Sequence, residues 1–180
     1  MAAFELLPWQ PAFAADIAPL ADDPGIAANL RDAFPSPYTL PDAQAFVANC
    51  IQGGNRGHLL RAIVVDGRAV GSIGLFAGQD IYRQSAELGY WLGRPFWGRG
   101  MMTEAVGRLC AEAFSRLPIV RIYAEPFAHN TASRRVLEKS GFVLEGTMRL
   151  AAVKNGELLD WCMYALLKEP DCLAQATPLA

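Results

Sequence analysis

The sequence predicts an α+β domain with helices near its start, a mostly antiparallel sheet, and two helices that cross between strands in its second half. Three patterns indicate this class. β-rich runs cluster in the central block, where Asp66-Gly67 joins two of them as a hairpin turn. From Met101 the apolar residues recur at helical spacing. The chain then returns to a β-rich run, a short helix and two long β-rich runs.

The composition suits one domain with a substantial core. Of the 180 residues, 52% are hydrophobic and 19% are charged. We expect a single domain over residues 1–168. Residues 169–180 are rich in proline and alanine and are expected to fray.

Charge, hydropathy and cysteine usage exclude several classes of protein. The net charge of −2 gives no basic field that would indicate nucleic acid or an anionic membrane as a partner. No apolar run reaches the roughly 18 residues of a membrane helix, and the first residues lack a signal-peptide pattern. The four scattered cysteines favour buried thiols in a reducing compartment, and His58 and His129 lack ligand spacing. We therefore expect a cytoplasmic protein without a metal site.

The first half of the chain is predicted to place helices before a hairpin. The predicted segments are a strand over 4–9, helical residues 12–33, an extended stretch over 34–42, a helix over 41–51, and a hairpin over 58–65 and 68–78. Asp23-Pro24-Gly25 is expected to break the first helical region, because proline suits a first helical turn. The prolines of the extended stretch fix a non-helical path.

The second half is predicted to alternate strands with helices. The predicted segments are a strand over 84–93, a helix from 101, a strand over 118–127, a helix over 130–142, and two strands around Lys154-Asn155-Gly156. The helix from 101 carries one apolar face, made of Met102, Val106, Leu109, Cys110, Ala113 and Phe114. Gly141 closes the shorter helix.

A glycine turn, Trp97-Gly98-Arg99-Gly100, lies between the strand over 84–93 and the helix from 101. Glycines permit a sharp turn and close approach of a ligand, and a helix start offers N–H groups to phosphate. No Walker loop is present, and Thr103 stands where a dinucleotide fingerprint needs its third glycine. On spacing alone, a phosphate cradle and an ordinary helix start with surface arginines both remain open.

Four motifs occur in order over residues 87–146: the strand ELGYW, the glycine turn before MTEA, an NxxS helix start, and KSGFVLEG. With them the chain resembles the GNAT superfamily of N-acetyltransferases, and most closely its RimJ/RimL-type branch of ribosomal-protein N-terminal acetyltransferases. Residues 29–47 are similar to the N-terminal region of that branch. The resemblance implies a mixed, mostly antiparallel sheet of about six to seven strands, helices on both faces, and a splay between two central parallel strands.

The resemblance implies acetyl-CoA as co-substrate. Its pyrophosphate would lie on the glycine turn and helix start, and its pantetheine arm on the free edge of the strand before the splay. The implied binding residues are Tyr90, Trp91, Leu92, Arg94, Trp97, Gly98, Arg99, Gly100, Met101, Met102, Thr103, Asn130 and Ser133. Pro95 stands where the family carries glutamine or arginine, so Arg94 or Arg99 is expected to replace that contact. The N–H groups near Leu88 to Tyr90 are the expected oxyanion donors.

Three residues are candidates for the chemistry. An ammonium must lose a proton before it attacks a thioester, and Glu87 is the implied base; a solvated strand glutamate is the alternative. The resemblance places Asn130 on the pantetheine arm and Ser133 at the sulfur, whereas a helix cap and first-turn filler are the alternatives. Leu137 and Ala152 stand where family members carry a catalytic tyrosine and glutamate. The base therefore stays open, and catalysis by positioning is an alternative.

The resemblance also implies an acceptor site. Its residues are Arg31, Phe34, Tyr38, Glu87 and Tyr123. A rigid surface loop is the alternative for the first three. Tyr123 shares a strand face with Glu125, and an ordinary half-buried pair is the alternative for these two.

The predicted function is direct transfer of the acetyl group of acetyl-CoA to a primary amine in a ternary complex. The acceptor is a protein N-terminus or a small-molecule amine. A non-enzymatic acetyl-CoA-binding or sensing module is the alternative, and a transferase for a longer acyl chain is a third hypothesis. The sequence leaves the acceptor and the oligomeric state open, with a homodimer through the last two strands as one arrangement.

Overall fold

Seven strands form one sheet in the order β1-β2-β3-β4-β5-β7-β6 in the computed structural model, which describes residues 3–54 and 57–168. The strands are β1 (Glu5–Leu7), β2 (Leu59–Val65), β3 (Arg68–Ala77), β4 (Ser85–Leu92), β5 (Arg121–Ala124), β6 (Val143–Lys154) and β7 (Glu157–Leu167). Strands β4 and β5 run parallel, and the other neighbouring pairs run antiparallel. The predicted α+β class and the mixed sheet are confirmed.

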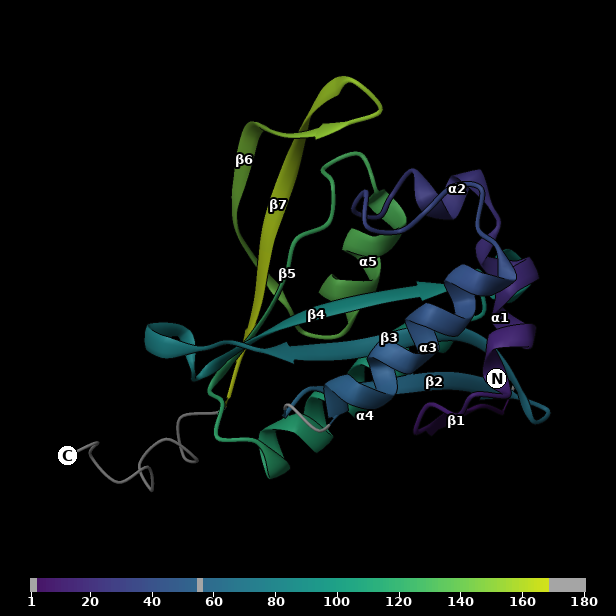
Figure 1. The fold of residues 1–180 in the computed structure, drawn as a ribbon. Helices are drawn as coiled ribbons and strands as arrows, with labels where there is room; N and C mark the ends of the chain where they lie inside the picture. Colours follow the sequence, from purple (N-terminus) through teal and green to yellow (C-terminus); the bar gives the residue numbers. More distant parts are fainter. Residues whose placement is uncertain (1–2, 55–56, 169–180) are drawn as a thin grey trace.

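Helices cover both faces of this sheet, as Figure 1 shows for α3 and α4. The helical segments are α1 (Phe13–Ala21), α2 (Pro24–Ala27), α3 (Leu40–Gly54), η1 (Asp80–Tyr82), η2 (Arg94–Phe96), α4 (Met101–Arg116) and α5 (Thr131–Lys139). One apolar core lies under α4 and α5, and a second lies under α1 and α3. Because strand side chains alternate, Leu88 of β4 enters the first core and Trp91 enters the second.

Local chemistry explains where α2 begins, and two predicted elements prove shorter than expected. The Asp23 side chain accepts a hydrogen bond from the Gly25 N–H at 2.7 Å and caps α2, with Pro24 in the first turn. The predicted break is therefore present, but helix ends at Ala27, and the prediction of helix up to residue 33 was wrong. The predicted strand over 118–127 is also too long, because only Arg121–Ala124 forms β5.

The two central parallel strands separate after a short contact, as Figure 1 shows. Their register comprises three pairs, which are Ser85 with Arg121, Ala86 with Ile122, and Glu87 with Tyr123. Beyond Glu87, β4 continues beside β3 as far as Leu92. The predicted splay is confirmed, and Glu87 lies at its apex.

The last two strands form the predicted hairpin. Asn155 and Gly156 turn it with positive φ angles of 52° and 81°, a conformation that glycine and asparagine adopt more readily than other residues. Lys154 before the turn is buried, and its Nζ lies 2.8 Å from the Asp32 carboxylate in the segment between α2 and α3. This ion pair ties the hairpin to the region that the sequence assigned to the acceptor.

Three cysteines, Cys50, Cys110 and Cys162, are buried free thiols, as their pattern predicted. Cys172 and the tail over 169–180 lie outside the described residues, so the expectation of fraying there remains a prediction. Among the helices of the described chain, none has the length and apolar character that a membrane crossing requires.

Leu137 offers a direct test of how α5 is held against the sheet, because its side chain is fully buried in the core under α4 and α5. We expect Leu137→Ala to lower the free energy of unfolding by about 2–5 kcal/mol through the cavity it leaves. Leu158 is 58% exposed, and Leu158→Ala is the matched control, expected to change stability by no more than about 0.5 kcal/mol. Urea denaturation compares the two, and equal losses would contradict this packing.

Candidate functional site

The site begins with the edge of β4 that β5 leaves unpaired. The Gly93 N–H donates to the Val70 carbonyl, and the Ser85 carbonyl accepts from the Gly78 N–H, so both of these residues point their backbone groups toward β3. In an antiparallel pair this direction alternates along the strand. Leu88, Tyr90 and Leu92 therefore point their N–H and C=O groups toward the splay.

Trp91 does not belong to this open edge, contrary to its expected backbone contact with a ligand. Its carbonyl oxygen faces β3, where it lies 2.6 Å from the position that a Cβ on Gly71 would take. Its side chain is 8% exposed within the core under α1 and α3. The carbonyl of Leu92 is already used, since it accepts a hydrogen bond from Trp97 Nε1 at 2.6 Å. The parallel pair of Glu87 with Tyr123 uses the Leu88 N–H, which donates to the Tyr123 carbonyl. The unused backbone groups are the carbonyl of Leu88, both groups of Tyr90 and the N–H of Leu92.

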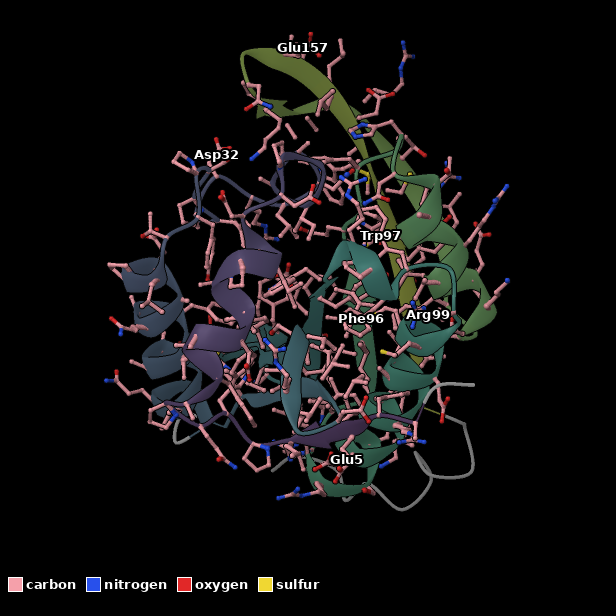
Figure 2. The ribbon with its side chains drawn as sticks, turned by 90° about the vertical axis from the view of Figure 1, so that its right-hand side faces the viewer. Glu5, Asp32, Phe96, Trp97, Arg99 and Glu157 are labelled. Atoms are coloured by element: carbon pink, nitrogen blue, oxygen red, sulfur yellow. The ribbon has the colours of Figure 1, made fainter. Side chains whose placement is uncertain are left out.

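The glycine turn connects this edge to the start of α4. Gly98 and Gly100 have φ angles of 73° and 74°, which side-chain-bearing residues seldom adopt. No side chain caps the N-terminus of α4 within the described residues, and Met101 and Met102 point their side chains into the core. The first turn therefore presents backbone N–H groups outward, beside Phe96, Trp97 and Arg99 in Figure 2.

The two arginines of the turn differ in their availability. Arg94 Nε and Nη2 each lie 2.6 Å from an Asp23 carboxylate oxygen, and its guanidinium lies 4.9 Å from the Trp97 ring centroid. This double contact holds the pKa of the Asp23 carboxyl at about 2. Arg99 stacks 5.7 Å from the Phe96 ring centroid and has no ion-pair partner within 3–54 and 57–168. Arg99 is thus the arginine free to meet an anion.

Tyr90 and Ser133 meet across the splay. The Tyr90 hydroxyl lies 2.9 Å from Ser133 Oγ and 3.2 Å from the Ser133 carbonyl oxygen. Burial raises the pKa of Tyr90 to about 12, so the phenol stays protonated near neutral pH. Asn130 Oδ1 accepts from the Ser133 N–H at 3.1 Å and caps α5. The sequence analysis did not predict this contact of the Tyr90 phenol. A usable signal was that Tyr90 lies on the opposite face of the strand from Glu87.

Glu87 lies in a three-residue ion cluster at the apex of the splay. Arg31 Nη2 lies 2.5 Å from Glu87 Oε1 and 2.8 Å from Glu125 Oε2. Burial raises the pKa of the Glu87 carboxyl above its ordinary value; the Arg31 charge opposes this rise and the Glu125 charge adds to it. The cluster brings together the expected Arg31 and Glu87 and adds Glu125 as a third member.

Of the other expected acceptor residues, Tyr123 lies beside this cluster, whereas Phe34 and Tyr38 pack toward the core under α1 and α3. Phe34 stacks on Tyr38 at 4.8 Å between ring centroids and meets Trp91 edge-on at 5.9 Å. Tyr38 is buried in that core, and its hydroxyl does not reach the surface. Tyr123 pairs in register with Glu87 and is half-buried, which raises its pKa.

Within residues 3–54 and 57–168, no group of three or more His, Cys, Asp or Glu side chains is placed to hold a metal ion. His58 accepts a hydrogen bond from the Ala77 N–H at 3.1 Å, and His129 stacks on Phe127. Leu137 is fully buried, so α5 offers no proton donor at that position.

Comparison with known sequences finds relatives that are named as N-acetyltransferases. The chain is 39% identical over 106 residues to the probable N-acetyltransferase YjcK of Bacillus subtilis, which is 59% of either protein. It is 36% identical over 106 residues to the putative ribosomal N-acetyltransferase YdaF of the same organism, which covers 59% of this chain and 57% of YdaF. The matched region thus spans less than two thirds of these two relatives.

Comparison with solved structures and family models agrees with the fold. The ribosomal L7/L12 alpha-N-protein acetyltransferase RimL, solved in complex with coenzyme A, superposes with a TM-score of 0.84 at 25% identity, over 93% of this chain and 95% of RimL. The family model described as acetyltransferase (GNAT) domain matches residues 4–143. The chain therefore belongs to the GNAT acetyltransferase family.

Proposed function

We propose that the chain transfers the acetyl group of acetyl-CoA to a primary amine by direct attack in a ternary complex. The observation that carries the proposal is the open edge of β4, which leads from Glu87 at the apex of the splay to the glycine turn at the start of α4. An extended ligand with amide groups at one end and phosphates at the other matches this path. The similarity to RimL, solved with coenzyme A, supports the same ligand.

The two ends of the path suit different parts of coenzyme A. The Leu88 carbonyl and both backbone groups of Tyr90 are available to the pantetheine amides, and the Tyr90 N–H can alternatively donate to the oxyanion that forms on the acetyl carbonyl. The outward N–H groups at the start of α4 and the free guanidinium of Arg99 suit the pyrophosphate.

The reaction removes protons from the acceptor nitrogen and adds one to the sulfur of coenzyme A. Glu87 takes a proton from the acceptor ammonium, since its raised pKa brings it closer to neutral pH than that of an ordinary glutamate. The neutral amine forms the new N–C bond as the C–S bond breaks; the nitrogen then releases its second proton, and the thiolate takes one up. Ser133, hydrogen-bonded to the protonated Tyr90, is the relay that the site offers, because its hydroxyl can give a proton to the sulfur and receive the one released by the nitrogen. Tyr90 orients the Ser133 hydroxyl from β4. Leu137 of α5 has an aliphatic side chain and donates no proton.

The acceptor is a primary amine held near Arg31 and Glu87. The similarity to an alpha-N-protein acetyltransferase favours a protein N-terminus over a small molecule. Release of free thiol from acetyl-CoA, measured with a panel of N-terminal peptides and small amines, tests the proposal. Tight coenzyme A binding without turnover on any acceptor would instead support an acetyl-CoA-binding module.

Gly100 and Arg99 test the assignment of the phosphate site. Gly100→Glu is expected to abolish coenzyme A binding, because it places a negative side chain at the helix start on backbone with a φ of 74°. Arg99→Gln is expected to weaken binding about tenfold through loss of one charge-assisted contact. Isothermal titration calorimetry measures both. Gly107→Glu, in open space on the same helix, is the matched control, and unchanged affinity in Gly100→Glu would refute the assignment.

Glu87 tests the assignment of the base. Glu87→Gln is expected to lower kcat by about 10²–10⁴-fold. In the wild type, kcat should fall as pH drops through the pKa of Glu87, which burial places above that of an ordinary glutamate. That acid limb should vanish in the variant, whereas Glu145→Gln, at a surface ion pair with Arg121, should retain it. An unchanged pH profile in Glu87→Gln would leave catalysis by positioning as the explanation.

A further inference from the structure

Arg31 places a single nitrogen atom between two carboxylates. Its Nη2 lies 2.5 Å from Glu87 Oε1 and 2.8 Å from Glu125 Oε2. The two glutamates come from β4 and from the residue after β5, the strands that separate at this point. One nitrogen that donates to two carboxylates is also the arrangement that a bound primary ammonium would adopt.

The two glutamates need a cation, and Arg31 is a loosely held one. The Glu87 and Glu125 side chains are 24% and 28% exposed, while the Arg31 side chain is 66% exposed. The two carboxylates both contact the same nitrogen atom, so their negative charges repel each other, and burial strengthens the repulsion. An ion pair with so exposed a partner contributes little stability, so another cation can replace it at small cost.

We propose that Glu87 and Glu125 form the docking site for the acceptor ammonium, and that Arg31 occupies this site until an acceptor displaces it. The inference rests on the proposed transferase function and makes it more specific, because it requires the acceptor to arrive as a cation. A neutral acceptor would leave two carboxylates without a counter-ion once Arg31 moved.

The surroundings of Arg31 allow its side chain to leave while its backbone stays. The neighbouring Asp32 is tied to the buried Lys154 at 2.8 Å. Farther along the same segment, Phe34 and Tyr38 pack against each other and toward Trp91. The segment is thus anchored on the C-terminal side of Arg31, and displacement requires rotation of one exposed side chain.

The resident cation differs chemically from the acceptor. A guanidinium does not give up its proton in proteins, so Arg31 cannot become a nucleophile at this position. An ammonium in its place transfers one proton to the Glu87 carboxylate and becomes a neutral amine. The Glu125 carboxylate accepts hydrogen bonds from the remaining N–H groups, while Tyr123 faces the same carboxylates from β5. The arrangement therefore excludes its own arginine from the reaction and admits a primary amine.

The binding of alaninamide tests this inference without requiring turnover. The side-chain carboxyl signals of Glu87 and Glu125 are followed by NMR in ¹³C-glutamate-labelled protein during titration with alaninamide and, separately, with N-acetylalaninamide. We expect a saturable shift with alaninamide alone. Arg31→Gln should bind it about fivefold more tightly than the wild type, since the resident competitor is gone. Arg31→Lys should resemble the wild type, and Glu125→Gln should bind more weakly.

Arg68→Gln is the matched control, because Arg68 makes a comparably exposed ion pair with Asp16 away from the splay. It should leave alaninamide affinity unchanged. Unchanged or weaker binding by Arg31→Gln, equal binding of N-acetylalaninamide, or no saturable shift in any variant would overturn the inference. Alaninamide binding as expected, with no thiol release from acetyl-CoA on any acceptor, would instead overturn the proposed transferase function and leave the ammonium site standing.

Discussion

The site depends on one constraint in the sheet, the loss of pairing between β4 and β5 after Glu87. Strand β5 is four residues long, and the chain after it stays with β7, where the Pro126 carbonyl accepts a hydrogen bond from the Cys162 N–H at 2.9 Å. Strand β4 therefore keeps a row of unpaired backbone groups beyond the apex. An unpaired edge usually invites association with another chain, and a bound ligand would satisfy the same groups. The ion cluster, the Tyr90–Ser133 contact and the glycine turn all surround this edge.

The gap stays open because each strand belongs to a different half of the sheet. Strand β4 pairs with β3 along its whole length, while β5 pairs with β7 and leads into the outer hairpin. Helix α5 lies between the halves, with Leu137 buried under it and Ser133 in contact with Tyr90. The two halves are thus joined by three residue pairs and spaced by a packed helix, so the opening needs no strained backbone.

Local patterns predicted most of the fold, whereas the fine structure of the site depends on distant contacts. The hairpin at Asp66-Gly67 and the helix from Met101 follow from turn chemistry and apolar spacing. The availability of Arg99 over Arg94 could not be predicted, because it depends on Asp23, 71 residues before Arg94. The bridge of Arg31 to Glu87 and Glu125 spans 56 and 94 residues. Propensity and periodicity carry no information about such pairs, and the short β5 likewise reflects where tertiary pairing ends.

Amide hydrogen exchange along β4, with and without coenzyme A, tests the central claim most directly. The open edge should exchange readily in the free protein at Tyr90 and Leu92, while Leu88 is already protected by pairing with β5, and Gly89 and Trp91 by pairing with β3. Coenzyme A should slow exchange at Tyr90, at Leu92 and at the start of α4, and leave the other three amides unchanged. Tight binding of coenzyme A with no added protection at Tyr90 and Leu92 would contradict the role given to the splay.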